Sequence, residues 1–572
     1  MYRPRYRRSR KHETTTTRKT TSKDFSWFRG FVVSWIACWG FIAAASPSAQ
    51  VAEQSCDAFL LAPRDVKGGK KVGPVSCAML ESDVTIDGKA FKRIDVGLNG
   101  SVEGYATRQG EYKDYLTQSP DLVFPQSGNP GPVLFAVANY ERDKGASMTI
   151  VYPRDRAAWN GKMFITVHGR GASFKQGGLK AWNQYRDDLN KYDVLMVSKG
   201  YALVKTRRTS AEGLGEIKAM FEDGTPVDSL AFNDTTHYIT DFGEVARKIA
   251  ADRLGRGPRL TYFYGHSAGA RIGRDLNYTP GLNIDRTGKR YFDGILADDA
   301  AAGTWLPVSM KDGKDVLFTN AADKATFVPQ IDISHQMYNN IWDHKMPAYM
   351  SPSYLANKRS NARILREKGL APAKERMYEI RGISHSGNES LSGRRGDGVI
   401  IDGLDLSRMM DRFVDILDAW VEQGTNPPPS HADVAAVGDA DNDGVIENPA
   451  LAFPEVACPL GVYFSYPEST SGTTSFAAFS GEGIEPLDGK KVFVDMNRNG
   501  VWDDRETPTQ AWRRLGLLQK HEDLTRDTYI ACVQRAAEQL RKEGFFSDKT
   551  AAQYVEQAKT AELQPKSKPP TQ

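Results

Sequence analysis

Residues 259–273, RLTYFYGHSAGARIG, contain the most informative pattern in the chain. An apolar and aromatic run of strand length leads into the pentapeptide GHSAG, and a stretch that can start a helix follows it. The pentapeptide matches G-x-S-x-G, which is short enough to occur by chance, so its surroundings must give it meaning. Strand, tight turn and helix together are what a nucleophile elbow requires. The stretch therefore predicts Ser267 as a nucleophile at the carboxyl end of a strand.

Apolar runs of strand length alternate with helical stretches on both sides of this turn, which predicts an α/β fold. The alternation is typical of a doubly wound, mostly parallel sheet with helices on both faces, as in an α/β-hydrolase. Strands are expected at 148–153, 162–169, 202–206, 259–265, 292–298, 315–320 and 376–382, and helices at 241–254, 404–424, 523–543 and after Ser547.

Changes of composition divide the 572-residue chain into four parts. Residues 1–50 form a leader, 51–125 a β-rich N-terminal segment, and 126–428 the α/β-hydrolase catalytic domain. The sequence TNPPPS at 425–430 interrupts the pattern. Residues 429–572 then form a C-terminal region with calcium loops and helices.

The leader has the layout of a secretory signal peptide. Residues 1–24 hold nine Lys or Arg against two acidic residues, and the apolar run FVVSWIACWGFIAAA follows at 31–45. Export with cleavage between Ala45 and Ala52 is preferred. An uncleaved membrane anchor is the alternative, because the charged part is long, although the apolar run is short for a membrane span.

The basic character of the chain belongs to this leader. The whole chain has a formal net charge of +4, but residues 1–24 alone carry +7, so the remaining residues carry 4 − 7 = −3. No motif for RNA or DNA binding is present, and no nucleic-acid partner is expected. Contact with a membrane is expected only through the leader, if it stays uncleaved.

Four cysteines remain after the leader, with Cys38, is removed: Cys56, Cys77, Cys458 and Cys532. An even number of cysteines in an exported chain indicates disulfides. Three pairings are possible. Cys56–Cys77 and Cys458–Cys532 are preferred because each pair lies within one region of the sequence.

A serine nucleophile needs a general base, and the base needs a carboxylate that orients it. In this fold the acid and then the histidine follow the serine along the chain. His385, in RGISHSGN just past the strand expected at 376–382, is the predicted base. His335 and His344 follow the candidate acids too, but neither is expected in a loop at the end of a strand.

Asp323 is the preferred acid, because it lies in the loop AADKATFVP after the strand expected at 315–320. Asp298 and Asp299, in LADDAAAG after the preceding strand, are the alternative. Loop position alone separates the candidates, so the choice of acid stays open.

The oxyanion of an acyl-transfer reaction needs backbone donors near the nucleophile. The N–H of Ala268, at the start of the expected helix, is one candidate. The loop HGRG at 168–171 is similar to the HGGG loop of esterases and supplies Gly169, Arg170 and Gly171 as the others. In the mechanism that follows, Ser267 forms an acyl-enzyme and the base then activates water.

Several of these stretches resemble the tannase and feruloyl esterase family of α/β-hydrolases. The resemblance rests on RAAWNGKMFITVHGRGASF, SKGYALVKTRR, FYGHSAGARIG and WVEQGTNPP, and it covers roughly residues 140–430. It implies the same fold and the hydrolysis of esters. The stretch TNAADKATFVP is similar to the acid loop of that family, which favours Asp323.

The chain departs from that family at two positions. The family has a disulfide between a cysteine before the nucleophile and one after the catalytic histidine, whereas this chain has His266 and Ser386 there. The resemblance therefore implies that packing alone holds the triad. The short span from Ser267 to Asp323 leaves no room for a large lid, so many esters, including oligomeric ones, could enter. The phenolic substrate of the family is not carried over.

A calcium loop is expected in the C-terminal region. The stretch VFVDMNRNGVWDDRETP fits D-x-[DN]-x-[DN]-G-x₅-E over its whole length. Side-chain oxygens and one peptide carbonyl can wrap a Ca²⁺ ion there. The expected ligands are Asp495, Asn497, Asn499, Val501, Asp503 and Glu506. A strand rather than a helix precedes the loop, so the ion is expected to be structural.

A second loop, GDADNDGVIENPA, offers Asp439, Asp441, Asp443 and Glu447. Position twelve is Ala450, so one carboxylate is missing and this site is expected to be weaker. Calcium is the only cofactor that we expect, and we expect no organic cofactor.

The preferred function is an exported serine hydrolase that cleaves carboxylic esters of small or oligomeric substrates. A serine peptidase or amidase of the same fold is one alternative, because a triad does not separate esters from amides. A non-catalytic, calcium-dependent binding protein on a hydrolase scaffold is the other.

Overall fold

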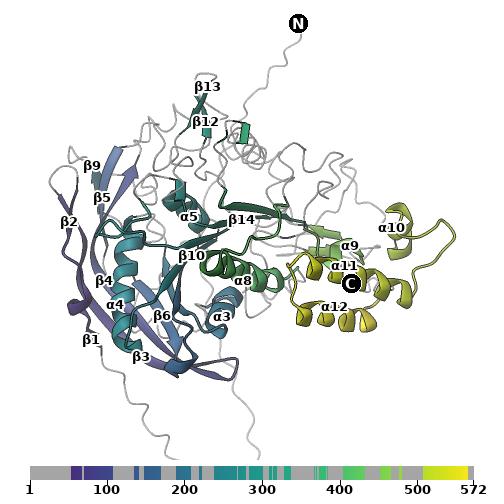
Figure 1. Cartoon of the computed structure of the whole chain (residues 1–572), viewed down its shortest axis with the longest axis horizontal. Helices are drawn as coiled ribbons and strands as arrows, with labels where there is room; N and C mark the ends of the chain where they lie inside the picture. The colour runs from purple at the N-terminus through teal and green to yellow at the C-terminus, as the bar shows by residue number, and fades with distance from the viewer. Residues whose placement is uncertain are drawn as a thin grey trace, which may run out of the picture. The chain divides into compact units, whose positions relative to one another are not determined.

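One large mixed sheet organises the chain in the computed structural model (Figure 1). Thirteen strands belong to it within the described residues, and its main path runs β1-β3-β4-β6-β8-β7-β10-β11-β14-β15. β2 pairs with β3, and β5 pairs with β4 and β9. The strands are β1 Gln54–Ser55, β2 Arg64–Val66, β3 Lys70–Ile86, β4 Lys89–Ala106, β5 Leu134–Tyr140, β6 Ser147–Pro153, β7 Lys162–His168, β8 Ala202–Arg207, β9 Lys218–Phe221, β10 Leu260–His266, β11 Gly294–Asp298, β14 Gln330–His335 and β15 Glu375–Ile380.

The structure describes most, but not all, of the chain after the leader. The described residues are 53–66, 70–106, 134–140, 147–168, 189–207, 218–221, 237–266, 268–278, 282–299, 308–311, 314–317, 327–335, 366–367, 369, 373–381, 383, 404–431, 451–460, 462–464, 476–478 and 507–563. The part from Val51 to Gln572 forms one compact unit. The boundaries expected at 125/126 and 428/429 stay predictions.

Six neighbouring strands, from β8 to β15 along the sheet, run parallel to one another. Helices cover both faces of this parallel part. They are α3 Lys191–Ser198, α4 His237–Leu254, α5 Ala268–Tyr278 and α8 Ser407–Gln423. The predicted doubly wound, mostly parallel sheet is therefore confirmed.

Alternation along the strands explains why both faces are covered. In β7, Met163, Ile165 and Val167 belong to the hydrophobic cluster that contains α4 and α5. Phe164, between them, belongs to the cluster that contains α3 and α8. Because successive side chains of a strand point to opposite faces, a strand that is apolar throughout needs a layer of helices on each side.

One expected strand is wrong. The stretch expected at 315–320 becomes β13 (Lys314–Leu317), which pairs antiparallel with β12 (Val308–Lys311) in a separate two-stranded sheet. The strand beside β11 in the main sheet is instead β14, with the sequence QIDISH. This strand was not expected from the sequence, because polar residues alternate with its apolar ones, yet every residue of it is buried.

The C-terminal helices share a hydrophobic cluster with α8. They are α9 Pro454–Ala457, α10 Pro508–Arg514, α11 Arg526–Lys542 and α12 Asp548–Thr560, and a short pair of strands, β16 Val462–Phe464 and β17 Phe476–Ala478, lies between α9 and α10 in sequence. The helices expected at 404–424, at 523–543 and after Ser547 are confirmed as α8, α11 and α12. Gly424 ends α8 in the left-handed conformation, with φ of 70°.

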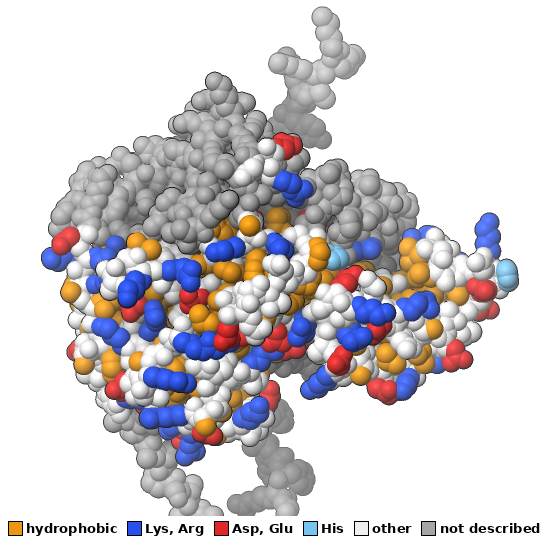
Figure 2. All heavy atoms as spheres, in the orientation of Figure 1, with side chains coloured by type: hydrophobic (Ala, Val, Ile, Leu, Met, Phe, Trp, Pro, Cys, Tyr) orange, Lys and Arg blue, Asp and Glu red, His pale blue; other side chains and the backbone are white. Residues whose placement is uncertain are grey.

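Charges of both signs are interspersed over the described surface that Figure 2 shows. Charged side chains separate the apolar side chains on that face, which do not form one continuous patch. Within the described ranges, no helix combines the length and the apolar character that a membrane crossing demands.

Both preferred disulfides are confirmed. Cys56 and Cys77 are bonded with a Cα–Cα distance of 4.9 Å, and Cys458 and Cys532 with 6.0 Å. The first bond ties the N-terminal residues to β3. The second disulfide joins the end of α9 to α11, and so links two of the C-terminal helices covalently.

An ionic cluster around the buried Lys162 fastens α8 to the sheet. Lys162, at the start of β7, is buried and its ammonium group contacts the carboxylates of Asp418 and Glu422 on α8. The hydroxyl of Tyr262 donates to the same Asp418 at 2.5 Å. Burial and this carboxylate hold the pKa of Tyr262 well above its usual value, so the phenol stays protonated and donates. The amino edge of the parallel strands is thus tied to α8.

Candidate active site

The turn between β10 and α5 has the geometry of a nucleophile elbow. β10 ends at His266 and α5 begins at Ala268, so Ser267 is the single residue between them. A Cβ atom on Gly265 would lie 2.2 Å from the carbonyl oxygen of Gly269, and one on Gly269 would lie 2.1 Å from that of Val167 in β7. Only glycine fits at either position. The predicted strand–turn–helix is confirmed, and the placement of Ser267 itself lies outside the described residues.

The carboxyl ends of β7, β10 and β11 meet at one edge of the sheet. His266 is in register with His168 of β7 on one side and with Asp298 of β11 on the other. The strand expected before the HGRG loop is therefore confirmed as β7, which lies beside β10. The donors expected there, Gly169, Arg170 and Gly171, lie outside the described residues.

Ala268 is the first residue of α5. The first N–H groups of a helix have no acceptor within the helix, and they carry the positive end of the helix dipole. The backbone N–H of Ala268 is therefore at the positive end of α5, and its role as an oxyanion donor stays a prediction.

The predicted triad acid and base both lie outside the described residues. His385 follows the end of β15, which is the position expected for the base. For Asp323 the argument changes, because the strand that was expected to precede it is not in the main sheet. Asp323 instead precedes the amino end of β14 in the chain. Asp298, the last residue of β11, lies at the carboxyl edge beside the elbow.

Asp298 is the centre of a buried polar network beneath the elbow. Its Oδ2 atom accepts from Nδ1 of His266 at 2.9 Å and from the hydroxyl of Tyr264 at 2.9 Å. Its Oδ1 atom is 2.9 Å from Nε2 of His335. Burial acts to raise the pKa of Asp298, but His335 and His266 outweigh it and hold the pKa well below its usual value. The carboxylate is therefore ionised and only accepts hydrogen bonds.

His335 lies at the end of a strand, contrary to the expectation from the sequence, because it is the last residue of β14. Both of its ring nitrogens face carboxylates: Nε2 faces Asp298, and Nδ1 is 3.4 Å from Oδ2 of Asp299. A general base needs a ring nitrogen directed at the nucleophile. His335 is thus engaged elsewhere, which agrees with the choice of another histidine as the base.

The expectation that packing alone holds the triad stays a prediction, because Ser267, Asp323 and His385 lie outside the described residues, but the residue before the serine has a polar partner. His266 stands where the resembled family has a bridging cysteine, and it is hydrogen-bonded across the strands to Asp298. The sequence shows this contact poorly, because the partners are 32 residues apart. The dipeptide Asp298-Asp299 at the end of an apolar strand was the available signal.

No group of three or more His, Cys, Asp or Glu side chains that could hold a metal ion occurs among the described residues. In the network beneath the elbow, the imidazole nitrogens are directed at the Asp298 carboxylate rather than at a common empty point. Both predicted calcium loops, with their ligands at 439–447 and 495–506, lie outside the described residues.

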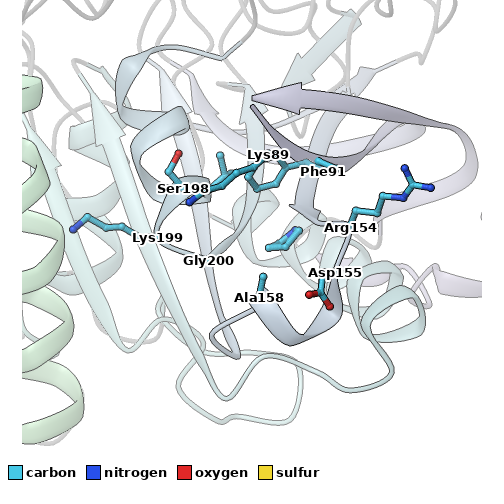
Figure 3. A pocket seen from close by; sticks show the side chains of 11 residues that line it. Lys89, Phe91, Arg154, Asp155, Ala158, Ser198, Lys199 and Gly200 are labelled. Atoms are coloured by element: carbon cyan, nitrogen blue, oxygen red, sulfur yellow. The ribbon is translucent and has the colours of Figure 1, made fainter. Parts of the chain in front are cut away.

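A surface pocket of about 670 Å³ lies at the other edge of the sheet (Figure 3). Residues at the start of β4, at the end of β6 and at the end of α3 line it, among them Phe91, Arg154 and Ser198. Lys199 points from its rim toward α8, where it pairs with Asp411 and Asp415. Since α3 leads into the amino end of β8, this pocket is far from the elbow along the parallel strands and is not the site of the nucleophile.

The sheet order, the two layers of helices and the glycine-tight elbow define an α/β-hydrolase. The chain belongs to the alpha/beta hydrolase domain family, whose model matches residues 126–556. No curated protein matches the sequence. Resemblance to tannases and feruloyl esterases stays a prediction.

Solved structures with a similar fold include two esterases and one depolymerase. Esterase B from Lactobacillus rhamnosis is 13% identical, with a TM-score of 0.20, and the match covers 42% of this chain and 63% of that one. LpqC, a poly(3-hydroxybutyrate) depolymerase from Bordetella parapertussis, is 14% identical over 51% and 88%, with a TM-score of 0.25. Thermogutta terrifontis esterase 2 is 15% identical over 50% and 95%, with a TM-score of 0.28. Matches this distant carry no conclusion about the substrate.

Proposed function

We propose that the protein is an exported serine hydrolase that cleaves carboxylic esters through an acyl-enzyme on Ser267. The observation that carries the proposal is the elbow: Gly265 and Gly269 allow the end of β10, the start of α5 and the backbone of β7 to approach more closely than any side chain would permit. Such a turn costs conformational freedom, and it is the arrangement that presents a serine between a strand and a helix N-terminus.

In the proposed mechanism, Ser267 attacks the ester carbonyl while His385 accepts its proton. The N–H of Ala268 and those of the 169–171 loop hold the oxyanion. After the alcohol leaves, His385 activates water and the acyl group is released. Asp323 orients His385 in this mechanism. Asp298 or Asp299 is the alternative acid, which is supported by the position of Asp298 at the carboxyl end of β11, beside the elbow.

The substrate is proposed to be a small or oligomeric ester. A serine peptidase or amidase is the second candidate, and a non-catalytic calcium-dependent binding protein is the third. The two disulfides support the proposal of a secreted or periplasmic location, since such bonds persist in oxidising compartments.

An active-site-directed fluorophosphonate probe tests the proposal. The folded, calcium-loaded protein is expected to react at Ser267, as shown by mass spectrometry of the labelled peptide, while heat-unfolded protein does not react. Hydrolysis of a short p-nitrophenyl ester without hydrolysis of the matching anilide would select the esterase. If the folded protein is not labelled, both enzyme functions are excluded and the binding protein remains.

Calcium is proposed as a structural ion in the 495–506 loop, with a weaker site at 439–447. Removing Ca²⁺ with a chelator is expected to lower the melting temperature, because an ion that binds only the folded state stabilises it by mass action. Readdition of Ca²⁺, but not of Mg²⁺ at equal concentration, is expected to restore it. An unchanged melting temperature after chelation would contradict the structural ion.

A further inference from the structure

We infer that Asp298 is a positioning residue for the nucleophile: it holds His266, the residue directly before Ser267, in a buried hydrogen-bonded network that fixes the elbow to β11 and β14. The inference rests on the proposed role of Ser267. It gives Asp298 a function that is different from orienting the catalytic base.

The first part of the network joins β10 to β11. His266 and Asp298 are directly opposite each other in the parallel register, and Tyr264 lies two residues before His266 on the same face of β10. Both donate to the same carboxylate oxygen, Oδ2. Tyr264 and His266, which lie on one face at the end of β10, are therefore both hydrogen-bonded to Oδ2 of Asp298.

The second part joins β11 to β14. The other oxygen of Asp298 accepts from His335, the last residue of β14. The next residue, Asp299, has a positive φ of 48° and accepts the backbone N–H of His335 at 2.8 Å through its side chain. A non-glycine residue rarely adopts this conformation, and aspartate does so more readily than most. The ends of the two strands are thus locked together beside Asp298.

The network lies entirely out of water, and this determines its strength. Tyr264, His266, Asp298 and His335 are all almost completely buried. In such an environment a charge-assisted hydrogen bond is strong, and a broken one leaves an unpaired polar group that cannot be hydrated. His266 is therefore held in one position at the end of β10, and through it the network would act on the residue that follows in the chain. A displacement of about 1 Å at a reacting group can cost about 100-fold in rate.

The test compares Asp298→Asn with Asp95→Asn. Asp95 is an equally buried carboxylate in the same sheet, bonded to Arg93 and Thr149 on β4 and β6, away from the elbow. Both variants lose a buried charge, so both are expected to melt at a lower temperature. Only D298N is expected to lower kcat for a p-nitrophenyl ester and the labelling rate by a fluorophosphonate, by about 10- to 100-fold, with KM within a factor of two.

Variants of His266 separate positioning from a role as triad acid. His266→Leu removes the contact from its other end and is expected to lower kcat as much as D298N. In the double variant the two effects are expected not to add in full, because both break the contact between His266 and the side chain at position 298. His266→Asn keeps a donor near the place of Nδ1 and is expected to restore most of the activity. Each rate is measured well below the melting temperature of the variant.

Three results would overturn the inference. Equal labelling rates for D298N and the wild-type protein would show that the network does not position the serine. A large loss in D298N with normal activity in H266L would assign Asp298 to the triad instead. An equal loss of kcat in D95N would show a general effect of stability. Should D298N fail to fold, H266L and H266N carry the same comparison. Failure of the wild-type protein to label would instead refute the proposed function.

Discussion

Replacing Ser267 with alanine is expected to reduce kcat for a p-nitrophenyl ester by at least about 10⁴-fold. The acyl-enzyme cannot form without the hydroxyl, so only the oxyanion donors and substrate binding remain to accelerate hydrolysis. KM and the melting temperature are expected to change little, because the substitution removes one oxygen atom from a turn whose backbone is determined by Gly265 and Gly269.

The control for this prediction is Ser82→Ala, on the N-terminal strand β3, which is expected to leave kcat unchanged. Both proteins are assayed at equal concentrations of folded material, with circular dichroism to confirm the fold. Residual activity within tenfold of the wild-type protein would contradict Ser267 as the nucleophile. It would direct attention to another hydroxyl at the carboxyl edge of the sheet.

The elbow could be predicted from the sequence because its causes are local. A strand, two glycines at fixed spacing and a helix lie within one stretch of the chain, and each is recognisable by its residue types. The two disulfides could also be predicted, since each joins two cysteines of one region of the sequence. Most strands of the parallel sheet could be predicted for a similar reason, because strands buried on both faces are continuous apolar runs.

β14 could not be predicted, and the reason is its buried polar residues. Gln330 of this strand is hydrogen-bonded to Asn277 of α5, and Asp332 pairs with Arg274 of the same helix. Their partners are more than fifty residues away in the chain, so no local pattern indicates that these polar groups can be buried. The argument for Asp323 from loop position depends on the strand expected at 315–320, and the described part of that stretch pairs outside the main sheet.

The network around Asp298 was hidden for the same reason. Its members come from three strands that are separated in the chain and meet only because the sheet places β10, β11 and β14 side by side. The sequence showed His266 in an unusual position beside the nucleophile but could not show what it contacts. A local motif predicts the site of chemistry, whereas the groups that hold the site in place depend on the order of the strands.

Replacing Gly269 with alanine is expected to destabilise the protein by more than about 4 kcal/mol and to reduce the activity per folded molecule at least about 100-fold. The added Cβ would lie 2.1 Å from the carbonyl oxygen of Val167 and 2.9 Å from its carbonyl carbon. These are backbone atoms of β7, which is hydrogen-bonded to a strand on each side. Because β7 cannot yield, α5 must move away and take the elbow with it.

Gly257→Ala is the matched control for this substitution. Gly257 lies in the turn before β10, a Cβ there would have no neighbour within 4 Å, and its φ is not in the left-handed region. Alanine at this position is expected to change stability by no more than about 1 kcal/mol, in the stabilising direction, through the unfolded state. Urea denaturation followed by tryptophan fluorescence measures both variants. If G269A unfolded at the same urea concentration as G257A, the close approach of α5 to β7 would be contradicted, and with it the observation on which the proposed esterase rests.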